Sequence, residues 1–87
     1  MYRARITPEA MRNIGHLPDK VRHAAMATIT GPLTENPRRL GKSLGGEFEG
    51  LWSARLVDYR IIYAIMEEDS VVMIHRIQHR RHVYRPN

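Results

Sequence analysis

The residues best suited to chemistry gather in the last ten positions, Gln78 to Asn87, most of which are His, Arg or Tyr. Cleaving a phosphodiester without a metal needs a base for the 2′-hydroxyl proton, cations for the charged transition state and an acid for the leaving 5′-oxygen. Imidazoles, guanidiniums and a phenol in one segment offer candidates for all three roles. The alternative is a disordered basic terminus, but the apolar Val83 and the aromatic Tyr84 favour a docked last turn.

Two further cations are predicted to meet across a hairpin. Side chains alternate faces along a strand, so Ser53 and Arg55 point one way while their neighbours point the other. If Val57-Asp58 is a two-residue turn, Arg55 lies directly opposite Arg60. Like charges in that arrangement cost stability, which makes sense if an anion normally lies between them. The alternative is that both side chains simply extend into solvent.

The first half of the chain predicts a strand followed by a helical hairpin. Residues Tyr2 to Ile6 alternate in character and stop at Thr7-Pro8, the pattern of an N-cap with a first-turn proline. The first helix has an apolar stripe made of Ala10, Met11, Ile14 and Leu17. A second helix restarts after Leu17-Pro18-Asp19 and ends before Asn36-Pro37. Its inward residues are predicted to be Val21, Ala24, Ala25, Thr28 and Ile29.

The second half predicts a three-stranded antiparallel meander. Residues 38–50 hold four of the six glycines and are interpreted as an ordered loop or irregular strand. Three segments rich in β-branched and aromatic residues follow: Leu51 to Leu56, Tyr59 to Met66 and Ser70 to Gln78. The apolar face that should meet the helices consists of Trp52, Leu56, Tyr59, Ile61, Tyr63 and Ile65.

These elements predict one compact α+β domain over residues 1–87, in the order β-α-α-β-β-β. An antiparallel sheet, with the first strand at one edge, packs against the helical hairpin, and a short turn or helix ends the chain. A domain of 87 residues has a modest core, so any chemistry must use a shallow surface site.

Composition points to a polyanionic partner. The chain carries 14 Lys plus Arg against 9 Asp plus Glu, a formal charge of +5. Most of these cations are Arg, whose planar fork grips phosphate in a bidentate manner, although a merely basic surface is the alternative. The absence of cysteine excludes disulfides, thiolate nucleophiles and zinc ribbons. No signal peptide or membrane span is visible in the first twenty residues, so we expect a cytoplasmic protein with no membrane partner.

Two tempting motifs do not fit. Gly41-Lys42-Ser43 resembles the end of a phosphate-binding loop, but Asn36 stands where that motif requires glycine. His75, His79 and His82 suggest a metal site, yet the stretch lacks a carboxylate or thiolate, and neighbouring arginines would repel a divalent cation. We therefore expect neither a metal nor another cofactor.

The stretch from Gly50 to Tyr63, which includes Asp-Tyr-Arg-Ile-Ile-Tyr, and the tail from His79 to Arg85 together resemble the RelE/ParE superfamily of toxins from prokaryotic toxin–antitoxin pairs. The resemblance covers nearly the whole chain. It implies a ribosome-dependent messenger-RNA endonuclease that leaves a 2′,3′-cyclic phosphate. It also implies a small antitoxin that wraps around the toxin and silences it.

The resemblance also implies roles for individual residues. In the RelE branch the strand before the hairpin offers two basic residues two positions apart. The matching positions here are Ser53 and Arg55, so only one of the two is basic. Because of Ser53 the identity of the general base stays open, and His82 or His79 could compensate. The residues expected to be catalytic are Arg60, Arg80, Tyr84, Arg55 and His82, with Arg81 a weaker match for the terminal arginine than Arg80. The residues expected to bind RNA are Arg81, Arg85, His79, Ser53 and Lys42.

Two other functions remain open at this point. One is a ParE-like protein that inhibits DNA gyrase by binding, which the presence of Arg60, Arg80 and Tyr84 disfavours. The other is a non-catalytic basic protein that binds nucleic acid or antitoxin, which Ser53 keeps possible. The partners expected are an acidic, partly disordered antitoxin and mRNA on the ribosome. Operator DNA is expected to be reached only through the antitoxin complex.

Overall fold

The computed structural model describes residues 1–83, and of His82 and Val83 it describes the backbone only. Five strands form one sheet in the order β1-β5-β4-β3-β2. The strands are β1 (Arg3–Ile6), β2 (Lys42–Ser43), β3 (Trp52–Leu56), β4 (Tyr59–Met66) and β5 (Val71–His79). The helices are α1 (Pro8–Gly15), α2 (Asp19–Thr30), α3 (Pro32–Glu35), α4 (Pro37–Leu40) and α5 (Arg80–Val83). The predicted α+β class, the helical hairpin and the meander β3-β4-β5 are confirmed.

The sheet differs from the predicted one at its first strand. β1 runs parallel to β5, with Arg3 opposite Val71 and Ile6 opposite Ile74, so the sheet is mixed. The antiparallel hairpins β3-β4 and β4-β5 set the direction of β5. The helices return the chain to the end of the sheet where β1 begins before the meander starts, so β5 runs the same way as β1. β1 is thus correctly predicted as an edge strand, but its parallel direction is not.

The helices begin where the sequence predicts and bury most of the predicted residues. The Thr7 hydroxyl oxygen accepts a hydrogen bond from the backbone N–H of Ala10 at 3.1 Å, which caps α1. Ala10, Ile14 and Leu17 are buried, but Met11 is 56% exposed, so its predicted place in the stripe is wrong. One position beyond Ala10 is a rotation of about 100° around the helix, which carries Met11 off a narrow apolar face.

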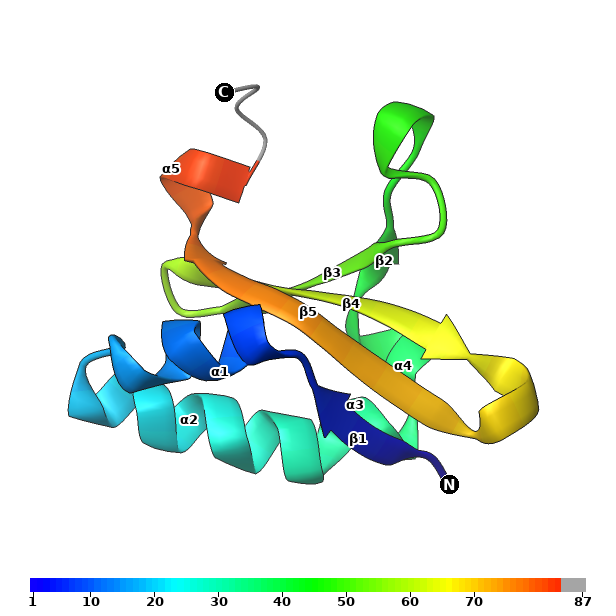
Figure 1. Cartoon of the computed structure of the whole chain (residues 1–87), viewed down its shortest axis with the longest axis horizontal. Coiled ribbons are helices and arrows are strands. Elements are labelled where there is room, and N and C mark those ends of the chain that lie inside the picture. The colour runs from blue at the N-terminus through cyan, green and yellow to red at the C-terminus, as the bar shows by residue number, and fades with distance from the viewer. Residues whose placement is uncertain (84–87) are drawn as a thin grey trace.

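The helical hairpin and a second structured segment flank the sheet differently. Figure 1 shows α1 and α2 on one side of the sheet, while α5 and the loop between β2 and β3 rise on the other side. Residues 38–50, predicted as an ordered loop or irregular strand, contain the end of α4 and the short strand β2. Pro37 is buried in the first turn of α4 and starts that helix. Among residues 1–83 no helix is both long enough and apolar enough to cross a bilayer.

Tyr63 joins the sheet to the segment that contains α4 and β2. Its ring is fully buried and stacks on Trp52 with ring centroids 6.4 Å apart. Its hydroxyl donates a hydrogen bond to the backbone carbonyl of Pro37 at 2.6 Å. The chain passes so close at Gly41 that a Cβ there would lie 2.8 Å from the Ser53 carbonyl oxygen and would also meet the Tyr63 hydroxyl. Only glycine fits that crossing, which brings α4 and β2 against β3.

Tyr63→Phe should reduce the loss of folding stability that the domain suffers at alkaline pH. Burial raises the pKa of Tyr63 to about 12, above the ordinary value of 10. Between these values the folded chain keeps the proton that the unfolded chain releases, so this contribution to stability is full below pH 10 and is lost as pH rises towards 12. The loss should reach about 2 kcal/mol by pH 12. Urea unfolding of wild type and variant at pH 8 and at pH 11.5 measures it, and a wild-type advantage that does not shrink at the higher pH contradicts it.

Candidate functional site

We call the side of the sheet opposite α1 and α2 the open face. It carries a cluster of polar side chains. Strand pairing brings the residues into register: Lys42 lies opposite Ser53, Arg55 opposite Arg60, and Arg60 opposite Gln78. The open face of strands β2 to β5 thus comprises Lys42, Ser53, Arg55, Arg60, Ile62, Arg76 and Gln78. Four of these residues are cations and none is a carboxylate. The set favours an anionic ligand.

The β3–β4 hairpin fixes the arginine pair. Leu56 pairs with Tyr59 across the two-residue turn, so Arg55 lies directly opposite Arg60, as predicted. Val57 adopts a positive φ of 55°, which is unusual for a β-branched residue and holds the turn tight. The Arg55 side chain folds back, and its Nε donates to the Val57 carbonyl at 3.4 Å. The turn therefore fixes both the register and the outward direction of the pair.

The same turn anchors the start of the C-terminal segment. The backbone N–H of Arg80 donates to the Asp58 carbonyl at 2.8 Å, so α5 begins beside the hairpin. Arg80 and Arg81 are exposed on α5. His82 has its backbone in α5, while Tyr84 and Arg85 lie outside the described residues. The structure thus brings the first predicted residues of the tail close to the Arg55–Arg60 hairpin.

His79 lies on the other side of the sheet from this cluster. It pairs with Tyr59, one position beyond the open-face pair Arg60 and Gln78. Its ring meets the edge of the Tyr59 ring, with centroids 5.3 Å apart. Its Nδ1 accepts a hydrogen bond from the backbone N–H of Arg81 at 3.3 Å. His79 therefore packs against Tyr59 and the start of α5, on the opposite side of the sheet from Arg55 and Arg60.

A β-bulge adds a residue to the open face that sequence reasoning missed. Ile62 pairs with Arg76 whereas Tyr63 pairs with Ile74, so His75 has no partner on β4. One extra residue reverses the alternation of side chains beyond it. Arg76 consequently faces the open side, and Gln78 follows it. The available signal was the spacing of Ile74 and Ile77, two buried residues three positions apart where a regular strand requires an even number.

A hollow of about 510 Å³ opens on this face. Its lining comes from β2, β3, β4 and the residues on either side of β2: Leu40, Gly41, Lys42, Ser43, Leu44, Ser53, Arg55 and Arg60. Figure 1 shows the loop between β2 and β3 on one side of the open face and α5 on the other. Four predicted site residues, Lys42, Ser53, Arg55 and Arg60, therefore line one cavity.

Three polar atoms on the open face are buried without a hydrogen-bond partner among residues 1–83. They are Ser53 Oγ, Arg60 Nε and Arg76 Nε. Ile62, which lies between Ser53 and Arg76 in the register, is fully buried although it is on the open face. Burying a polar group without a partner costs about 1 to 3 kcal/mol, and such groups are few in native proteins. These three atoms lie together in the part of the open face made by β3, β4 and β5.

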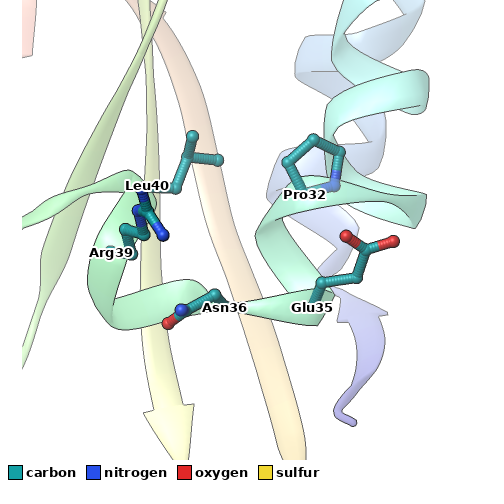
Figure 2. Close-up of a pocket in the computed structure, with 5 residues that line it drawn as sticks. All are labelled: Pro32, Glu35, Asn36, Arg39 and Leu40. Carbon is teal, nitrogen blue, oxygen red and sulfur yellow. The ribbon is translucent and has the colours of Figure 1, made fainter.

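A second hollow, of about 590 Å³, lies between α3 and α4. Figure 2 shows Pro32 and Glu35 on one side of it and Arg39 and Leu40 on the other, with Asn36 at the junction. One acidic and one basic side chain give it no excess of charge. Because it lacks the cluster of cations found on the open face, it is a weaker candidate for an anion site.

Comparison with known proteins identifies the family. The family model "ParE toxin of type II toxin-antitoxin system, parDE" matches residues 4–84. The toxin RelE of Mycobacterium tuberculosis is 44% identical over 86 residues, which cover 99% of this chain and 89% of that toxin. This chain belongs to the RelE/ParE superfamily of type II toxins. The toxin RelG of the same organism is 38% identical over 84 residues, 97% of each protein.

Solved structures of RelE-type toxins share the fold. The chain matches a crystal structure of the RelBE2 toxin–antitoxin complex of Mycobacterium tuberculosis with a TM-score of 0.87 and 37% identity, covering 90% of this chain and 96% of that one. The isolated RelE toxin of E. coli matches with a TM-score of 0.75 at 21% identity, covering 91% and 84%. The predicted membership of the RelE-like branch of the superfamily is confirmed. The open face described above is thus the open face of a RelE-type toxin.

Proposed function

We propose that this RelE-type toxin is a metal-independent endoribonuclease that cuts mRNA on the ribosome. The observation that carries the proposal is the patch of unpaired donors on the open face, where Arg60 lines a hollow beside Arg55 and next to the start of α5. Guanidinium groups that are held in place and lack an internal partner are suited to a phosphate whose negative charge grows in the transition state.

The reaction is an intramolecular transfer. The 2′-oxygen attacks the adjacent phosphorus as its proton passes to a base, and the bond from phosphorus to the 5′-oxygen breaks as that oxygen receives a proton. The products are a 2′,3′-cyclic phosphate and a 5′-hydroxyl. Arg60 and Arg55 stabilise the non-bridging oxygens. Arg80 on α5 is the third cation in this proposal, with RNA contacts from Lys42, Ser53, Arg81 and Arg85.

The base and the acid are assigned to the tail. A free phenol has a pKa near ~10, so Tyr84 acts as a base at neutral pH only if nearby cations stabilise its phenolate. Arg80, Arg81 and Arg85 are the arginines closest to it in the chain and could do this. His82 is the second proton carrier in this scheme, since imidazole titrates near neutral pH. His79, which packs against Tyr59, is assigned to RNA contact in this scheme.

The partners follow from charge and from the solved relatives. A +5 chain with four cations on one face suits a partner that is acidic and partly disordered and folds on binding. A solved relative is a toxin–antitoxin complex, and we assign this chain a cognate antitoxin. Operator DNA is reached only through that complex, and the toxin acts in the cytoplasm. The small, shallow hollow offers few groups to position RNA, so the ribosome supplies the geometry.

A cleavage assay separates this function from its main alternative. Purified toxin should cut mRNA during translation in a reconstituted system, should cut the same free RNA much more slowly, and should leave gyrase supercoiling unchanged. The family model that matches the chain carries the name ParE, and this favours gyrase inhibition as the second candidate. Inhibited supercoiling without RNA cleavage would support that second function. Neither activity, together with tight antitoxin binding, would indicate a non-catalytic binding protein.

A further inference from the structure

The bulge in β5 is held in place from the helix side. The Thr7 hydroxyl donates to the carbonyl of His75, the unpaired residue, at 2.8 Å. The Asn13 side-chain oxygen of α1 accepts from the backbone N–H of Ile77 at 2.9 Å. These contacts satisfy two backbone groups at the irregularity with side chains from α1 and its cap. The bulge is therefore built into the packing of α1 against β5.

The bulge determines where Arg76 points. Val72 and Ile74 face the core, so uninterrupted alternation would turn Arg76 inward as well and push Ile77 outward. The extra residue reverses this outcome. Ile77 is 3% exposed in the core, and Arg76 reaches the open face. A buried guanidinium without a counter-charge would be very costly, so this reversal is a condition for folding as well as for placing the side chain.

On the open face Arg76 lies in a cross-strand row whose positions on β3 and β4 carry no cation. Its direct neighbour across β4 is Ile62, and beyond Ile62 on β3 comes Ser53. Ser53 is uncharged, and both its Oγ and Arg76 Nε are buried without a partner among the described residues. Adjacent strands are about 4.8 Å apart, which is within reach of an arginine side chain. Arg76 is only partly buried, so the terminal nitrogens of its guanidinium can extend over Ile62 towards an anion on this face.

We propose that Arg76 binds an RNA backbone phosphate above Ile62, and that Asn13 and Thr7 are positioning residues that act through the bulge. The proposal rests on the proposed function and names a further part of its site. Arg76 supplies from β5 the cation that position 53 does not supply from β3. With Lys42, Arg55 and Arg60 it forms a cluster of cations that spans four strands in two neighbouring cross-strand rows, which suits the repeated phosphates of a nucleic-acid strand.

Arg76→Gln should weaken binding of a 2′-deoxy oligonucleotide, which cannot be cut by 2′-attack, about tenfold at low salt. Each phosphate contact with a single strand adds about 0.7 to the slope of log affinity against log salt, so the slope should fall by about that amount. Arg12→Gln, which removes an exposed arginine of α1, is the matched control and should leave the slope unchanged. If Arg76→Gln does not fold, Arg76→Met keeps the aliphatic stem over Ile62 and allows the same test.

The positioning role has its own readout. Asn13→Ala should lower the salt slope as Arg76→Gln does, and the double variant should be no worse than Arg76→Gln alone, because both changes remove one contact. Asn13→Asp keeps the acceptor oxygen and should keep the slope. A loss of thermal stability in Asn13→Ala with an unchanged slope would mean that Asn13 is only structural, and that part of the proposal would be wrong.

Ser53→Lys in the Arg76→Gln background completes the test, because a cation on the other side of Ile62 should restore the slope. If Arg76→Gln binds and titrates with salt like wild type, the proposal is overturned. A wild-type toxin that shows the salt effect but cuts no RNA would refute the proposed function and leave the phosphate site intact. An unchanged oligonucleotide slope with weaker antitoxin binding would assign Arg76 to the antitoxin interface, which also overturns the proposal.

Discussion

Replacing the 2′-hydroxyl at the cleavage site by hydrogen should abolish cutting by this toxin. In the proposed reaction the nucleophile belongs to the substrate, and the protein contributes cations and proton carriers. Without the 2′-oxygen no bond to phosphorus can form, so the expected loss is complete within the detection limit. The measurement is cleavage of an mRNA with one 2′-deoxynucleotide at the mapped site during translation.

The control is the same message with the 2′-deoxynucleotide three positions away, which should be cut normally. Trapping the product as a 2′,3′-cyclic phosphate on the unmodified message gives a second readout of the same chemistry. Continued cutting at the 2′-deoxy position would exclude intramolecular attack. The nucleophile would then have to be water, and the open face carries no carboxylate among its described residues to activate it.

Arg60→Ala should lower the cleavage rate about a hundredfold, the equivalent of about 3 kcal/mol of transition-state stabilisation. Arg60 lines the hollow directly opposite Arg55, so its guanidinium can offer a fork of donors to a phosphate there. Single-turnover cleavage on translating ribosomes measures the effect. Arg60→Lys should recover only part of the rate, since a point charge replaces a planar fork of donors.

Folding should not explain that loss. Removing an unpaired buried donor relieves a desolvation cost, so Arg60→Ala should unfold at a temperature equal to or above that of wild type. Arg12→Ala removes an exposed arginine away from the open face and should keep full activity. Full toxicity of Arg60→Ala in cells at matched expression would show that Arg60 does not hold the scissile phosphate.

The part of the site that could be predicted depends on local rules. A two-residue turn determines its own register, so Val57-Asp58 was enough to place Arg55 opposite Arg60. Regular alternation then placed Ser53 on the same face and residues such as Leu56, Ile61 and Tyr63 on the core face. No long-range information was needed for either step.

The missed features depend on contacts between distant segments. The direction of β1 is set by β5, and nothing in residues 3–6 specifies a parallel partner. The bulge that turns Arg76 outward requires Asn13 and Thr7, which are distant in sequence from β5. Met11 was placed wrongly for a different reason. The apolar stripe of this short helix is narrow, so a residue one position from Ala10 already lies outside it. The missed residue of the site, Arg76, thus lies just after the bulge that breaks the period of β5.

The sheet order has a consequence for how the chain acquires its fold. β1 is synthesised first but pairs with β5, the last strand, so the pairing of Arg3 with Val71 cannot form until β5 has been synthesised. A pairing of such high contact order closes late. A nascent chain that ends after β4 lacks Arg76 and all of α5, and it exposes the β4 edge that β5 later covers. Such a chain has only part of the cation cluster that we propose binds phosphate, so under the proposed function it should not cut RNA before β5 emerges.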